Sequence, residues 1–261
     1  MVEIVKQFND MINKYIRTIT FPVAVRFYKE GEELPPKTKI PTRDFGDRIL
    51  ICQAVGLVRR YGWTVAFHDE DQCCPVAQFM FGFREEPDFV RDGKIVYPLY
   101  AGSMEAGACT QAQVPRLPKA DTHCVVFAPL DKCDFEPDIV VCYGNPAQIV
   151  RLIQGSLYNT GGQLECSFAG RTACGSEVIV PYMKDQCNVI VPGGGERAFG
   201  YAGDDEMAFA IPRSKMKDVI EGVVAVHKAG VARIPTPFVG LTTRPAMPSV
   251  YKDIEELYGM R

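Results

Sequence analysis

The chain has 261 residues, 47% hydrophobic and 23% charged, a composition that excludes a disordered protein and a short disulfide-stapled scaffold. Its net charge is −3, so the chain lacks the excess of basic residues that is typical of proteins that bind nucleic acid. No apolar run is long enough to cross a bilayer and the first residues do not form a signal peptide pattern, so we expect a cytoplasmic protein with no membrane partner.

The first segment, residues 1–20, is predicted to form an amphipathic helix. Val5, Phe8, Ile12 and Ile16 recur at helical spacing and form one apolar stripe, with polar residues on the other side. This stripe predicts a helix packed against the body of the protein.

The middle of the chain contains two stretches that resemble each other, residues 21–134 and 135–230. The apolar run 22–28 aligns without a gap with 137–143, and each run begins with Pro. Further pairs follow in the same order along both stretches. In sequence letters, they are Gln53-Ala-Val-Gly with Gln148-Ile-Val-Arg, Cys74-Pro-Val-Ala with Cys174-Gly-Ser-Glu, Ile95-Val-Tyr-Pro with Val189-Ile-Val-Pro, and Val125-Val-Phe-Ala with Met207-Ala-Phe-Ala.

These matches predict an internal duplication of one α/β unit, with the two copies related by a pseudo-two-fold axis. Because strands and helices alternate within each copy, we expect an α/β or α+β fold with mixed sheets. Sites often form at such interfaces, so the equivalent cysteines Cys74 and Cys174 are expected to converge there.

Three segments have individual predictions. Residues 30–47 are polar, contain Pro, have no counterpart in the second copy and are expected to form a lid or surface excursion. Residues 100–119 are rich in small side chains and are expected to form an irregular loop. Residues 231–261 are a Pro-rich tail with a short final helix from about residue 249 to 258.

Cysteine is unusually frequent: the chain has ten cysteines, and none of them form a C-x-x-C pair. A cytosolic chain of this size does not need disulfides, so the cysteines are thiols, metal ligands or small core residues. Cys124 and Cys142 lie inside apolar strands and are expected to be packing residues. The candidate metal ligands are Cys52, Cys73, Cys74, Cys109 and Cys174.

The cysteines that begin helices are the strongest candidates in this set. Pro75 suits the first turn of a helix, which places Cys74 at its N-cap, and Cys174 is predicted in the equivalent position. A helix N-terminus lowers the pKa of a thiol, and thiolate is the form that zinc or an iron–sulfur cluster binds. Buried cysteine is also a common small hydrophobe, so packing remains the alternative for both.

A second candidate is the segment Pro192-Gly-Gly-Gly-Glu-Arg197, which follows a predicted strand. Consecutive Gly residues can turn backbone N–H groups toward an anion, and Arg197 can add a charged fork. The dinucleotide fingerprint also requires a helix at this point, and the following residues 199–203 are a poor helix sequence. The segment is therefore either a tight turn or a binding loop formed by Gly193, Gly194, Gly195 and Arg197.

The remaining polar features have two interpretations each. Gln53 and Gln148 either hydrogen-bond a ligand between the two copies or cap their helices. The acidic clusters 69–71 and 204–206 are typical of solvated turns. Nucleophile elbows, Walker loops and H-E-x-x-H pairs are absent from the sequence, which leaves common hydrolase and NTPase classes without support.

Several segments resemble the archaeal and bacterial family called domain of unknown function 169, and together they cover nearly the whole chain. They include Phe21-Pro-Val-Ala-Val-Arg-Phe, Ile51-Cys-Gln-Ala-Val, Cys74-Pro-Val-Ala, Glu136-Pro-Asp-Ile-Val-Val, Asn145-Pro-Ala-Gln, Ala173-Cys and Asp204-Asp-Glu. The resemblance implies occurrence mainly in anaerobes and no particular reaction. Many members resemble Gly-Cys-x-Gly-Cys-Arg where this chain has Gly193-Gly-Gly-Glu-Arg197, so a cluster bound there in relatives would need other ligands here, with Cys109 as the substitute.

Two functional hypotheses follow. The first is a protein that binds a cysteine-ligated metal cofactor, an iron–sulfur cluster or alternatively zinc, with a redox or cofactor-handling role and a redox partner protein. The second is a metal-free module that binds an anionic or planar small molecule between the copies. In either case the protein could form a homo-oligomer. A thiol-dependent enzyme with Cys74 or Cys174 as nucleophile is a weaker third, because no His is near either in sequence.

Overall fold

The structure is a computed structural model that describes residues 2–119, 122–231 and 249–259. Its centre is one six-stranded sheet in the order β2-β3-β1-β4-β6-β5. The strands are β1 (Val23–Tyr28), β2 (Val65–Phe67), β3 (Cys124–Pro129), β4 (Ile139–Gly144), β5 (Asn188–Ile190) and β6 (Met207–Pro212).

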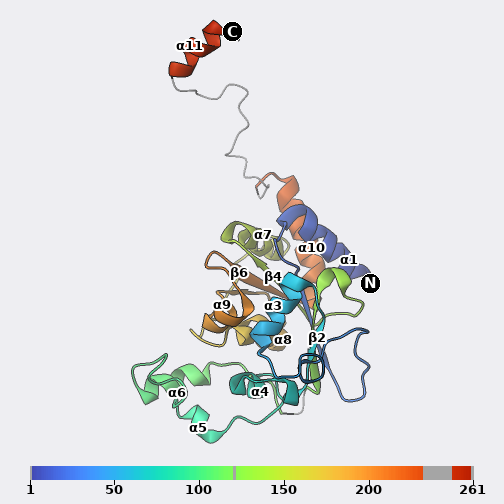
Figure 1. The fold of residues 1–261 in the computed structure, drawn as a ribbon, viewed down its shortest axis with the longest axis vertical. Coiled ribbons are helices and arrows are strands. Elements are labelled where there is room, and N and C mark those ends of the chain that lie inside the picture. Colours follow the sequence, from blue (N-terminus) through green and yellow to red (C-terminus); the bar gives the residue numbers. More distant parts are fainter. Residues whose placement is uncertain (1, 120–121, 232–248, 260–261) are drawn as a thin grey trace.

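Helices cover both faces of the sheet (Figure 1). The α-helices are α1 (Glu3–Met11), α2 (Pro41–Asp44), α3 (Ile51–Tyr61), α4 (Pro75–Met80), α5 (Asp88–Arg91), α6 (Met104–Ala112), α7 (Pro146–Leu157), α8 (Val180–Lys184), α9 (Gly194–Gly200), α10 (Met216–Lys228) and α11 (Val250–Leu257). Short 3₁₀ or π turns are η1 (Ile12–Ile16), η2 (Asp69–Asp71), η3 (Leu130–Lys132), η4 (Gly175–Ile179) and η5 (Arg213–Lys215).

The strands are apolar on both sides because both faces are covered. In β1, Val23 and Val25 pack against α3, α4 and η4, whereas Ala24 and Tyr28 pack against α1, α7 and α10. We call these two sides the α3 face and the α10 face. This arrangement explains why the strand sequences are nearly continuous apolar runs rather than alternating ones.

The α/β class is confirmed, but the expectation of mixed sheets is wrong. Every ladder between named strands is antiparallel. Parallel pairing occurs only at isolated bridges, Lys39 with Val65 and Ile49 with Gln72, among the residues that the structure describes. Only β2 with β3 and β5 with β6 are consecutive pairs, and the longer connections between the other strands return each strand antiparallel to its neighbour.

The internal duplication is not confirmed. The strand order is symmetric about the β1–β4 pair. A two-fold axis that relates two antiparallel neighbours is perpendicular to the sheet, so equivalent residues and helices of two copies would lie on the same face of the sheet. The ungapped alignment instead matches Tyr28 on the α10 face with Tyr143 on the α3 face. The helices that follow, α3 and α7, also cover opposite faces. Residues 95–98 form turns where the alignment expects a strand.

The segment 30–47 has two different parts. Residues 30–33 are exposed, as a surface excursion would be. Further along, Lys39 N–H donates to the carbonyl of Thr64 at 2.8 Å and the Lys39 carbonyl accepts from Ala66 N–H at 2.9 Å. This second part therefore protects β2, which is an edge strand of the sheet.

Helix ends follow the predicted signals in several places. Cys74 is the N-cap of α4 and Pro75 occupies its first turn, as predicted. The N-terminal helix extends as α1 and η1 to Ile16, with Val5, Phe8 and Ile12 fully buried. No helix in the described part of the chain is long and apolar enough to span a membrane.

Candidate thiol and carboxyl site

Two of the five predicted ligand cysteines, Cys52 and Cys174, lie close enough on the α3 face for each thiol to shift the pKa of the other. Cys52 is in the first turn of α3, and Cys174 directly precedes η4. Cys74 packs against the same core cluster and has a smaller effect on the pKa of Cys174. The predicted close pair was Cys74 with Cys174, whereas the thiol that acts most strongly on Cys174 is Cys52.

The two thiols have opposite properties. The neighbouring Cys174 thiol lowers the pKa of Cys52, although burial and the nearby Glu177 act in the other direction. The pKa of Cys174 is raised well above its usual value by the Cys52 thiol and by burial. The expectation that a helix N-terminus lowers the pKa of Cys174 is wrong, because the neighbouring thiol and the buried position outweigh it.

Helix α9 is held close to α3 by glycines, and this contact positions Cys52. A Cβ atom on Gly200 would lie 2.7 Å from the Cys52 carbonyl oxygen, and one on Gly56 would lie 3.0 Å from the Gly200 carbonyl oxygen. A Cβ atom on Gly195 would lie 3.4 Å from the Cys52 sulfur. The Gly-rich segment thus lies directly against the thiol pair.

Two buried glutamates lie beside the thiols. Glu177 in η4 is 1% exposed and Glu196 in α9 is 3% exposed. Tyr143 Oη donates a hydrogen bond to Glu177 Oε1, and Glu196 Oε2 accepts one from Gly193 N–H at 3.1 Å. The two carboxyl groups are close enough for each to shift the pKa of the other.

The pKa values of both glutamates are raised. Burial raises the pKa of Glu177 to about 7. Burial raises the pKa of Glu196 well above its usual value, with further contributions from Glu177 and Cys52. Glu196 Oε1 has no hydrogen-bond donor within the described residues. A cation bound beside the carboxyl pair would satisfy this oxygen.

Arg59 provides the positive charge next to this network. Its side chain is fully buried, its Cζ lies 3.9 Å from the centre of the Tyr143 ring, and it forms an ion pair with Glu206. Two of its nitrogens, Nε and Nη1, have no partner in the described part of the chain. A guanidinium, two carboxyls and a tyrosine in one buried cluster are typical of a functional site rather than of packing.

A small pocket opens next to the thiols. Its volume is about 200 Å³, and its lining includes Ala173, Ser176 and Gly193, which flank the site residues in sequence. Arg171 also lines it, with a pKa lowered by burial and its Cζ 5.6 Å from the Tyr100 ring centre. The pocket could admit a small anionic or planar group.

The other predicted site residues do not join this cluster by any described contact. Cys73 and Cys109 are exposed, and Cys109 lies in α6, a helix where a loop was expected. Arg197 donates to the carbonyls of Pro192 and Gly203 and to Asp204, so its guanidinium holds its own loop. The helix α9 begins after Gly193 and ends at Gly200, so residues 201–203 of the expected poor helix 199–203 lie outside any helix.

The two glutamines act as caps and lie on opposite faces of the sheet. Gln53 Oε1 accepts from Leu50 N–H at 2.8 Å. Gln148 Oε1 accepts from Asn145 N–H, and its amide donates to the carbonyls of Ile16 and Arg17. Both therefore have the capping role that the sequence analysis left open, and they do not meet in one cleft.

Sequence reasoning missed Glu177, Glu196, Tyr143 and Arg59. One signal was present, because Glu177 is followed by the apolar residues 178–180 and a carboxyl in that position is buried with its helix. Glu196 was taken as part of a turn, and only the packing of α9 on α3 shows that it is enclosed.

Comparison with known proteins identifies the family. Residues 11–222 match the family DUF169, described as uncharacterised ArCR. The chain belongs to this family. It is also 30% identical over 205 residues to the uncharacterized protein MJ0308 of Methanocaldococcus jannaschii, a match that covers 77% of this chain and 85% of that protein. No solved structure matches the chain.

Proposed function

We propose that this member of the DUF169 family binds a cysteine-ligated metal cofactor, an iron–sulfur cluster, at Cys52, Cys174 and Cys74. The observation that carries the proposal is that the Cys52 and Cys174 thiols lie close enough to shift each other's pKa, and that Cys74 also acts on the pKa of Cys174. Thiolates are the ligands that iron–sulfur clusters and zinc require. The cofactor would serve a redox or cofactor-handling step with a partner protein.

The surroundings of the thiols support a bound cation. Cys52 has a lowered pKa, which favours the thiolate that a metal binds. Glu196 Oε1 lacks a donor within the described residues, and Cys52 is close enough to raise the pKa of the Glu196 carboxyl. A further ligand would come from Glu196 or from one of the exposed cysteines, Cys73 and Cys109.

Protein purified without oxygen tests this proposal. We expect iron, acid-labile sulfide and broad visible absorption, all strongly reduced in Cys52→Ser and Cys174→Ser. Cys166→Ser is a matched control, because Cys166 is half-buried and its sulfur accepts a hydrogen bond from Val189 N–H, which a serine hydroxyl can also accept. Zinc without visible absorption, lost in the same two variants, would assign a zinc site. Absence of any metal, or metal retained in both variants, would contradict the proposal.

A second candidate function is a metal-free module for an anionic or planar ligand. The observation in its favour is the pocket beside Gly193 that Arg171 lines. Arg171→Gln would then abolish ligand binding while Cys52→Ser would leave it unchanged. Catalysis by Cys174 as a nucleophile is disfavoured, because its raised pKa keeps it as a thiol at neutral pH.

A further inference from the structure

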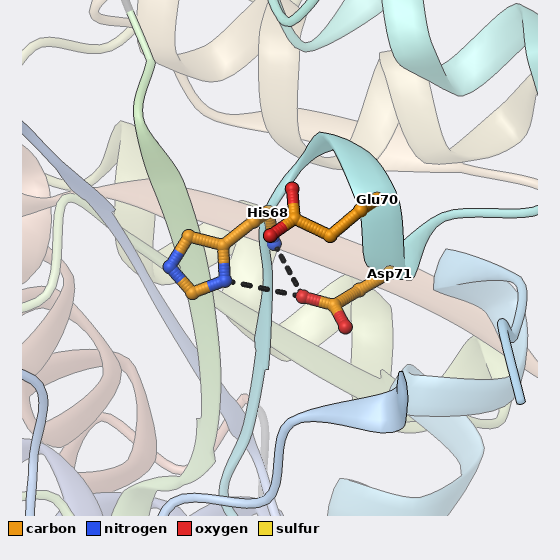
Figure 2. A group of neighbouring side chains, drawn as sticks. All are labelled: His68, Glu70 and Asp71. Carbon is orange, nitrogen blue, oxygen red and sulfur yellow. Dashed lines mark hydrogen bonds and ion pairs between the residues drawn. The ribbon is translucent and has the colours of Figure 1, made fainter. Parts of the chain in front are cut away.

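The acidic turn 69–71 has its partners within its own chain (Figure 2). Asp71 Oδ2 accepts from His68 N–H at 3.0 Å and lies 3.1 Å from His68 Nδ1. Its other oxygen accepts from the backbone N–H and the hydroxyl of Thr42. The ring of His68 also packs against that of His123, with the two centres 5.4 Å apart. Both oxygens of Asp71 are engaged, so this turn fixes the end of β2 and does not indicate a ligand.

Arg171, by contrast, is a partly buried cation without a counter-ion. Its Nη1 donates to Gln111 Oε1 at 3.2 Å, and its Cζ lies 5.6 Å from the centre of the Tyr100 ring. Within the described residues, no ion pair joins its guanidinium to an Asp or a Glu, and burial lowers its pKa. A guanidinium that has lost part of its hydration and has no partner charge in the chain is suited to bind an anion.

A buried polar chain from α6 fixes the position of Arg171. Gln111 is fully buried; its amide donates to Glu86 Oε1 at 2.7 Å, and its own Oε1 accepts from Arg171. Glu86 is buried too, and its charge is balanced by ion pairs with Arg91 and Arg116. Arg171 is therefore held by a neutral acceptor, which orients the guanidinium and leaves its charge uncompensated.

The backbone on both sides of Arg171 is in the left-handed region. Gly170 has a φ of 69° and Thr172 has a φ of 56°. Glycine adopts this conformation freely, whereas it is costly for a β-branched residue such as threonine. The Thr172 hydroxyl donates to the Arg171 carbonyl at 2.6 Å and helps to hold the turn. Backbone strain of this kind is typical of segments that orient a side chain for binding.

The pocket that Arg171 lines is small and mainly apolar. Its volume is about 200 Å³, and its walls include Phe168, Ile190, Val191 and Pro192. Apart from Arg171, none of the described residues that line it is charged. A polyanion would need further cations, so the pocket matches a ligand with one negative charge and an apolar body.

We propose that this pocket binds a small monocarboxylate with an apolar body, such as an aromatic acid, through a bidentate contact with Arg171. Two parallel N–H···O bonds to a carboxylate are the arrangement that a guanidinium favours. The Nε and Nη2 atoms of Arg171 form one edge of the guanidinium, and no acceptor is described for either among the described residues. This assignment rests on the second candidate function, because it names the ligand of the same pocket.

Fluorine NMR with 4-fluorobenzoate tests this assignment, and 4-fluorobenzamide serves as an uncharged molecule of the same shape. Full-length protein purified without oxygen is titrated with each compound. We expect saturable binding of 4-fluorobenzoate and at least tenfold weaker binding of the amide, because only the carboxylate can pair with the guanidinium. Arg171→Gln should weaken binding of 4-fluorobenzoate at least tenfold. Arg171→Lys keeps the charge without the planar fork and should restore part of the affinity.

Two controls and a second pocket variant accompany the titration. Arg84→Gln removes an exposed cation outside the pocket and should bind 4-fluorobenzoate like the unaltered protein. Cys52→Ser should also leave this binding unchanged, which separates the pocket from the proposed metal. Val191 is 52% exposed and lines the pocket, so Val191→Trp should fold, fill the pocket and weaken the binding of 4-fluorobenzoate. Thermal melting checks that each variant is folded.

Three results would overturn the assignment. Equal binding of the benzoate and the benzamide would remove the role of the carboxylate. Unchanged binding of 4-fluorobenzoate in both Arg171→Gln and Val191→Trp would place the ligand elsewhere. Binding of inorganic phosphate that depends on Arg171, without binding of 4-fluorobenzoate, would overturn the ligand class and leave the second candidate function standing. Absence of binding by all three probes would count against both.

Discussion

At the scale of single residues, one side-chain type has two different roles in this chain. Cys124 and Cys142 are buried in β3 and β4, as predicted, and burial raises the pKa of Cys124 to about 12. These thiols are packing residues that stay protonated. Cys52 has a lowered pKa because a second thiol, Cys174, lies near it. Local sequence does not distinguish the two roles, since Cys174 is 122 positions away.

The carboxyl pair should make stability depend on pH. The pKa of Glu177 is about 7 in the folded protein and close to 4.5 when the chain unfolds, so the folded state binds more protons between these values. Its contribution is fully present below about pH 4.5 and is lost as the pH rises through about 7. We expect the free energy of unfolding to fall by up to about 3 kcal/mol over this range.

Urea unfolding at several pH values between 4.5 and 8 measures this effect. Glu177→Gln keeps an acceptor for Tyr143 and cannot ionise, so its profile should be flatter than that of the unaltered protein. Glu85→Gln, an exposed change, should leave the profile as it is. Parallel profiles for the unaltered protein and Glu177→Gln would show that the carboxyl pair does not hold a proton.

At the scale of elements, the site depends on how closely α9 approaches α3. This approach is possible because Gly200 has no side chain where it faces the Cys52 carbonyl oxygen. The glycines that begin and end α9 are poor helix formers, but packing on α3 and the cap in which Glu196 accepts from Gly193 N–H stabilise this short helix. The element therefore forms through tertiary contacts that sequence propensity does not contain.

Gly200→Ala should consequently destabilise the protein. The new methyl group would lie 2.7 Å from a backbone oxygen that cannot rotate away, and overpacking of this kind costs about 1–3 kcal/mol. Urea unfolding measures the change, and the metal content of the variant should fall with it. Gly194→Ala is the matched control in the same helix, because nothing lies within 4 Å of the position of its Cβ atom. Equal stability of the two variants would contradict this account.

At the scale of the whole molecule, the two covered faces of the sheet form one folded unit. The family match spans residues 11–222, which include all six strands, the thiols and both buried glutamates. Helix α11 lies outside this range and buries none of its residues. The predicted short final helix is confirmed, whereas most of the Pro-rich tail lies outside the described residues.

A chain that ends at Gly230 should therefore keep the stability and the metal content of the full chain. Thermal melting and iron analysis of the two proteins, purified in parallel, measure both properties. The control is a chain that ends at Arg213 and therefore lacks the packed helix α10. This chain should lose stability, because Met216, Val219 and Val223 of α10 are buried in the core. A clear loss of stability in the chain ending at Gly230 would mean that the tail packs on the body.

The sequence by itself determined the α/β class, the family, the buried strand cysteines and the N-cap position of Cys74, because these depend on local apolar runs, capping signals and motifs. It did not determine on which face of the sheet each helix lies. The apparent repeat aligned Tyr28 with Tyr143, although these two residues lie on opposite faces of the sheet. Only the tertiary structure decided that Cys52 lies near Cys174, that Glu177 lies near Glu196, and that the ring of His68 meets that of His123. The physical reason is that each of these contacts joins residues far apart in the chain, and their pKa values depend on burial that no local pattern records.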